Sequence, residues 1–148
     1  MITVEVEIFT DGACRGNPGP GGWAALLRKG THERLINGAE NATTNNRMEL
    51  RAAIEGLRAL SRTTQVSITT DSQYVRQGVT EWMKRWKANG WKTTSRGSVK
   101  NKDLWVELDE LNEYHAVQWF WVKGHSGHEE NERVDHAANK AIDDLLKD

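Results

Sequence analysis

One short stretch near the N-terminus restricts the fold more than any other. From Val4 to Phe9, apolar residues alternate with polar ones, and this period of two indicates a β-strand. Asp11-Gly12 and a glycine-rich segment follow directly. Ligand sites of α/β domains lie beyond the carboxyl ends of strands, where the strand order reverses. Asp11 is therefore a candidate site residue if this strand is central, although Asp-Gly is also a common turn dipeptide.

The remaining pattern alternates strand-like and helix-like segments. Residues 12–22 hold five glycines and both prolines, which predicts a loop. Further strands are expected over residues 22–28, 34–39, 65–70 and 117–122, the last nearly all apolar, as in a buried parallel strand. Helices are expected over residues 43–60, 72–78, 81–89, 101–112 and 131–146.

These segments predict an α/β fold with one mixed sheet. The helix between the first and fourth strands makes those strands parallel, because parallel neighbours need a crossover. We predict a single domain over residues 1–148, with a five-stranded sheet of order 3-2-1-4-5 flanked by helices. Asp11 and Asp71 then end neighbouring parallel strands at the same edge.

Four acids suggest a metal site at that edge: Asp11, Glu49, Asp71 and Asp135. Simpler readings exist, since Glu49 could form a capping box with Asn46, Asp71 could cap a helix, and Asp135 could serve a helix dipole. Four neighbouring carboxylates would repel one another unless a cation neutralised them. Oxygen ligands indicate Mg²⁺ or Mn²⁺, and paired ions of this kind hydrolyse phosphodiesters.

A histidine follows the last expected strand. His125 lies in the loop of residues 123–128 and is aimed at the same edge of the sheet. A lone loop histidine is more often inert, but here it could transfer a proton during catalysis. His128 is given no role.

The segment from Trp82 to Lys102 is basic and aromatic. It contains seven Lys and Arg residues and no acid, although the whole chain has a net charge of -1. Trp82 and Trp86 are four residues apart, so at least one of them is expected to pack into a local core. Basic residues interleaved with aromatic ones are typical of nucleic-acid binding. The candidate phosphate contacts are Lys84, Arg85, Lys87 and Lys92.

Composition restricts the class of protein and its expected compartment. With 37% hydrophobic and 28% charged residues, the chain is expected to be a globular protein and a monomer. No apolar run reaches the roughly 18 residues of a membrane span, and no secretory signal is visible. Cys14 is the only cysteine, which excludes an intrachain disulfide and makes the cytoplasm the expected compartment.

In combination, these motifs resemble the ribonuclease H type 1 family, and closely its single-domain bacterial members. The resemblance spans nearly the whole chain. It rests on Phe9-Thr10-Asp11-Gly12-Ala13-Cys14, Gly16-Asn17-Pro18-Gly19-Pro20-Gly21-Gly22, Thr44-Asn45-Asn46-Arg47-Met48-Glu49-Leu50, Thr70-Asp71-Ser72-Gln73-Tyr74-Val75, Val122-Lys123-Gly124-His125 and Asn131-Glu132-Arg133-Val134-Asp135.

The resemblance implies an endonuclease that hydrolyses the RNA strand of RNA–DNA hybrids by two-metal-ion catalysis, leaving 5′-phosphate and 3′-hydroxyl ends. The family's metal ligands match the four acids above, and its mobile histidine matches His125. Its minor-groove contacts match Cys14, Asn17, Asn45, Asn46 and Gln73. Its phosphate-pocket threonine matches Thr44, and its basic protrusion matches the Trp82–Lys102 segment, with Trp82 near the DNA strand.

Two alternative functions are compatible with part of this pattern. A transposase-like or exonuclease-like relative would share the fold, but the asparagines and the histidine loop argue against it. A hybrid-binding module without catalysis is disfavoured because all four acids are present.

Overall fold

The computed structural model describes residues 4–92, 99–123 and 128–147. Its strands are β1 (Val6–Cys14), β2 (Gly19–Lys29), β3 (His32–Thr43), β4 (Gln65–Thr70) and β5 (Ala116–Trp121). Its helical elements are α1 (Asn45–Arg58), α2 (Gln73–Gln77), the π-helical turn η1 (Gly78–Trp82), α3 (Met83–Ala88), α4 (Lys102–Tyr114) and α5 (Glu129–Leu146).

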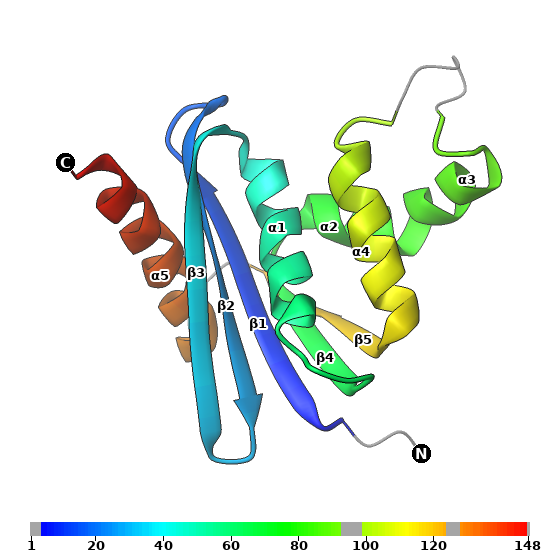
Figure 1. Cartoon of the computed structure of the whole chain (residues 1–148), viewed down its shortest axis with the longest axis horizontal. Coiled ribbons are helices and arrows are strands. Elements are labelled where there is room, and N and C mark those ends of the chain that lie inside the picture. Colours follow the sequence, from blue (N-terminus) through cyan, green and yellow to red (C-terminus); the bar gives the residue numbers. More distant parts are fainter. Residues whose placement is uncertain (1–3, 93–98, 124–127, 148) are drawn as a thin grey trace.

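The five strands form one sheet in the order β3-β2-β1-β4-β5 (Figure 1), which confirms the predicted topology. β1 pairs antiparallel with β2 and parallel with β4, and β5 pairs parallel with β4. β1 is therefore the central strand, as expected.

Helices cover the sheet on two sides (Figure 1). The alternation along β2 shows how: Ala25 and Leu27 join the larger core, which includes the apolar side chains of α1 and α4. Ala24 and Leu26 instead pack with Val134 and other side chains of α5. Successive strand residues face opposite sides, so α1 and α5 hold β1 and β2 between them.

The first predicted loop is shorter than residues 12–22. β1 continues to Cys14 and β2 begins at Gly19, so Asp11-Gly12 is inside a strand and does not form a turn. Gly12 is required by packing. A Cβ at this position would lie 2.5 Å from the backbone nitrogen of Glu49, so the start of α1 rests directly on the backbone of β1.

The expectation that the fifth strand is buried was also wrong. β5 is an edge strand, and Phe120 is 49% exposed. Its apolar sequence reflects packing on one side, where Trp119 and Trp121 contact the main core.

Within the described residues, no helix has the length and apolar character required to cross a bilayer.

Candidate active site

Asp11 lies where the central strand loses one neighbour. The last parallel pair between β1 and β4 is Phe9 with Thr69, while β1 runs on to Cys14 against β2 alone. Asp11 is two residues past that last pair and is only 2% exposed. By strand alternation it shares the side of Phe9 and Ala13, which pack with α5.

Glu49 reaches this point from α1. The capping box considered for Glu49 and Asn46 is not formed, because Thr44 caps the helix and its Oγ1 accepts a hydrogen bond from the Arg47 N–H at 3.2 Å. Glu49 is 6% exposed and stands on the turn of α1 that rests on Gly12. Its carboxylate is therefore directed at the site instead of serving the helix terminus.

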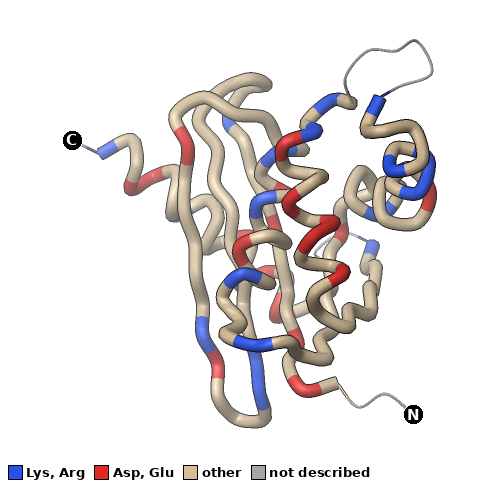
Figure 2. Tube along the Cα trace, turned by 45° about the vertical axis from the view of Figure 1, so that its right-hand side comes forward, with Lys and Arg blue, Asp and Glu red and all other residues tan. Residues whose placement is uncertain are grey.

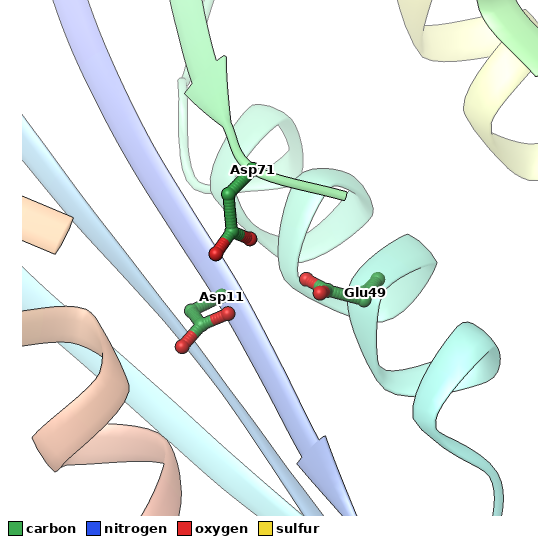
Figure 3. Close-up of side chains that lie close together, drawn as sticks. All are labelled: Asp11, Glu49 and Asp71. Carbon is green, nitrogen blue, oxygen red and sulfur yellow. The ribbon is translucent and has the colours of Figure 1, made fainter. Parts of the chain in front are cut away.

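Asp71 follows β4 directly. The capping role considered for it belongs to Ser72, whose Oγ accepts a hydrogen bond from the Val75 N–H at 3.1 Å. Carboxylate oxygens of Asp11, Glu49 and Asp71 all lie within 4.8 Å of one another. Figure 3 shows the three side chains pointing toward a common space between β1, β4 and α1.

Asp135 approaches from the other side, on α5. It lies beyond the first turn of that helix, which carries Glu129, Glu130 and Glu132, so the expected dipole role falls to those residues. Its carboxyl group interacts with Asp11 through a hydrogen bond and through charge. Asn139 Nδ2 donates to the Asp135 backbone carbonyl at 3.0 Å.

The electrostatics of the cluster are unfavourable without a cation. Burial, followed by the charge of Asp71 and the interaction with Asp135, raises the pKa of Asp11 from 3.8 to about 8. Burial and the charge of Asp11 raise the pKa of Glu49 well above its ordinary value. The Gly12 N–H offsets part of both shifts.

These acids form a donor set that fits a divalent cation. Glu49 Oε1 is buried and has no hydrogen-bond partner within the described residues. A buried carboxylate oxygen without a donor is costly unless it is protonated or bound to a cation. The three grouped side chains offer oxygen atoms alone, which suits a hard ion such as Mg²⁺ or Mn²⁺.

The polar residues matched to nucleic-acid contacts lie at the ends of elements that form the site. Cys14 ends β1, and its thiol lies 3.4 Å from the Thr43 carbonyl oxygen. Asn17 is exposed in the β1–β2 loop. Thr44, Asn45 and Asn46 form the start of α1, and Gln73 is the exposed first residue of α2. His125 lies outside the described residues.

α3, which carries part of the basic segment, lies beyond α4 (Figure 1), and Figure 2 shows Lys and Arg gathered on it. As expected, the tryptophans of the segment are partly core residues: the rings of Trp82 and Trp86 lie 5.7 Å apart, and that of Trp86 lies 5.5 Å from Trp105. A hollow of about 330 Å³ beside them is lined by Tyr74, Trp82, Arg85, Trp86, Asn89, Lys92 and Lys100. Residues 93–98 of the segment lie outside the described residues.

Two of the candidate phosphate contacts differ in their surroundings. Lys87 Nζ lies 3.2 Å from both Asp109 and Glu113 of α4, so its charge already has partners. Arg85 has no ion pair within the described residues and lines the hollow. Sequence alone could not separate the two, because the acids of α4 are distant along the chain.

Side-chain hydrogen bonds that the sequence did not predict join the starts of three helices. The Tyr74 hydroxyl accepts hydrogen bonds from Trp105 Nε1 at 2.9 Å and from Asn101 Nδ2 at 3.1 Å. Arg47 binds Asp103 through two hydrogen bonds of 2.7 and 3.0 Å. Together these contacts tie the starts of α1, α2 and α4 to one another. Their partners are separated by 27 to 56 residues, which leaves no local pattern to detect.

Comparison with known proteins agrees with this geometry. The RNase H family model matches residues 3–143. A ribonuclease H of Hydrogenovibrio crunogenus is 66% identical over 95% of this chain and 97% of its own length. One of Halorhodospira halophila is 64% identical over 95% of both chains. The crystal structure of LC9-RNase H1, a type 1 RNase H with the type 2 active-site motif, matches with a TM-score of 0.85 at 37% identity, covering 97% of this chain and 75% of that one.

Fold and site thus define a metal-dependent nuclease that acts on RNA. The chain belongs to the ribonuclease H family, and the resemblance read from the sequence is confirmed.

Proposed function

We propose that this chain is an endonuclease that hydrolyses the RNA strand of RNA–DNA hybrids and leaves 5′-phosphate and 3′-hydroxyl ends. The observation that carries the proposal is the convergence of Asp11, Glu49 and Asp71 within 4.8 Å, with Asp135 beside Asp11. Membership of the ribonuclease H family supplies the substrate class.

The four acids would hold one or two divalent cations, Mg²⁺ by preference with Mn²⁺ as the alternative. When bound, two such ions supply an activated water and stabilisation of the leaving oxygen in phosphodiester hydrolysis. Burial of Asp11 and Glu49 keeps these ligands in a low-dielectric setting where charge interactions are strong. His125 is proposed to transfer a proton near the same edge.

Recognition is proposed to combine two surfaces. Short polar side chains at the starts of α1 and α2 (Asn45, Asn46 and Gln73) can hydrogen-bond to 2′-hydroxyl groups, which distinguish RNA from DNA. Cys14, Asn17 and Thr44 extend the same surface. The DNA strand is proposed to contact Trp82, Lys84, Arg85 and Lys92 by stacking and phosphate binding.

A cleavage assay tests the proposal. Labelled RNA–DNA hybrid, duplex DNA and duplex RNA are incubated with the protein in Mg²⁺, with Asp11→Asn as the matched inactive control. We expect cutting of the hybrid RNA strand alone, and products that accept a 5′ label only after phosphatase treatment. Cutting of duplex DNA, or an intact hybrid, would refute the proposal.

The domain organisation, oligomeric state and compartment are also proposed. We propose one domain over residues 1–148 acting as a monomer in the cytoplasm, on the grounds of its length and its single cysteine. Light scattering of the purified protein checks the monomer.

A further inference from the structure

A small polar hollow lies beside Asp71, at the end of the sheet that carries the acids. It has a volume of about 130 Å³ and is lined by Asp71, Ser72, Gln73, Arg76, Trp121, Val122 and Lys123. This space corresponds to roughly four water molecules. It is large enough for a phosphate group but too small for a nucleobase with its sugar.

Two cationic side chains, Arg76 and Lys123, line this hollow together with one acid, Asp71. Within the described residues, Arg76 and Lys123 form no ion pair, whereas arginines such as Arg28, Arg51 and Arg133 are each bound to a glutamate. Two cations against one acid leave the lining with an excess of positive charge, which attracts an anion.

The guanidinium group of Arg76 also lies over an aromatic side chain, within cation–π range. It lies 6.0 Å from the centre of the Trp121 ring. Trp121 is stacked on Trp119, with ring centres 5.7 Å apart and planes 11° from parallel. Trp119 Nε1 in turn donates to Asn112 Oδ1 at 3.0 Å. Trp121, itself packed on Trp119, thus gives the guanidinium group of Arg76 an aromatic neighbour beside the hollow.

We propose that Arg76 and Lys123 bind a backbone phosphate of the cleaved strand, next to the phosphate that is hydrolysed. The assignment to that strand follows from Asp71, which lines the hollow and is also one of the three grouped carboxylates. The contact fixes where the strand lies relative to the acids, so Arg76 and Lys123 are positioning residues. This inference rests on the proposed function.

The test pairs a protein change with a substrate change. In the strand that is cut, a few ribonucleotides are flanked by deoxynucleotides. A neutral methylphosphonate replaces the phosphates next to the cleavage site, one at a time. For the wild type, we expect kcat/KM to fall roughly ten-fold at one position, mainly through KM. On the unmodified substrate, Arg76→Ala should lower kcat/KM by about the same factor. A methylphosphonate at the sensitive position should then lower the kcat/KM of Arg76→Ala no further, because both changes remove the same contact.

Two variants separate this role from a structural one. Arg34→Ala removes an exposed arginine of β3 that also has no ion pair within the described residues, and it should leave the methylphosphonate effect intact. Arg76→Lys keeps the charge and should recover part of the lost activity. Equal methylphosphonate effects in the wild type and Arg76→Ala at every position would overturn the inference while leaving hybrid cleavage standing. A wild type that leaves the unmodified hybrid intact would instead refute the proposed function.

Discussion

Replacing Asp11 by asparagine should stabilise the metal-free protein while abolishing turnover. The pKa of Asp11 is raised from 3.8 to about 8 in the folded state, because the carboxyl group is buried beside Asp71 and Asp135. Folding therefore favours its protonated form. The resulting cost is absent below pH 3.8, grows as the pH rises, and is complete above about pH 8.

The size of the effect follows from the shift. One pKa unit corresponds to about 1.4 kcal/mol, so an isolated site with this shift would cost about 4 kcal/mol at pH 7. The actual gain should be smaller for two reasons. The remaining acids share the repulsion with Asp11, and a buried asparagine side chain needs hydrogen-bond partners of its own. We therefore expect a gain of about 2–3 kcal/mol at pH 7, or roughly 4–12 °C in Tm for a chain of this size.

Urea unfolding in a chelating buffer at pH 4, 6 and 8 measures this gain. The matched control is Glu110→Gln, which changes an exposed acid of α4 and should leave stability nearly unaltered. Saturating Mg²⁺ should narrow or reverse the difference in the free energy of unfolding between the wild type and Asp11→Asn, because only the wild type retains the complete ligand set. A gain that is equal at pH 4 and pH 8, or a loss at both, would refute the reasoning.

Other expectations follow from single contacts. Gly12→Ala should cost about 1–3 kcal/mol of stability and weaken Mg²⁺ binding measured by calorimetry, since its Cβ would lie 2.5 Å from the Glu49 nitrogen. An unchanged Mg²⁺ affinity would show that α1 can shift without moving Glu49. Arg85→Ala should lower the slope of log K against log salt for hybrid binding by about one, while Lys87→Ala should leave it nearly unchanged because Lys87 already pairs with two carboxylates. Equal slopes for the two variants would contradict this distinction. Burial lowers the pKa of His115, whose Nδ1 accepts from a backbone N–H at 3.1 Å, so stability should fall as the pH drops below 6.5. His115→Asn should flatten that fall in urea unfolding, and an identical pH profile would count against it.

Much of the fold could be predicted from local patterns. The two-residue period of β1 and the helix before β4 are properties of neighbouring residues, and a crossover permits only a parallel pairing. The same patterns could not give the exact extent of β1. Asp11-Gly12 has the local chemistry of a turn, and only the approach of α1, with Met48 and Glu49 against Gly12, explains why glycine is needed inside a strand.

The candidate site likewise combines features that local patterns predict with features that depend on tertiary packing. That Asp11 and Asp71 share an edge follows from strand direction, but the positions of Glu49 and Asp135 depend on how two helices pack on opposite sides of β1. The structure excludes their simpler roles, because Thr44 caps α1 and because α5 begins at Glu129, which leaves Asp135 beyond its first turn. Contacts between charged groups far apart in the chain, such as Lys87 with Asp109, have no local signature at all.

Gly12 connects packing to the chemistry of the site. The absence of a side chain lets the first turns of α1 lie against β1, and the same closeness buries Glu49 beside Asp11. Burial and mutual repulsion then raise both pKa values, which makes the metal-free state costly. A bound cation removes that cost, so part of its affinity comes from relief of strain already present in the fold. Tight packing at one glycine thus brings Glu49 to the central strand and raises the cost of the metal-free state.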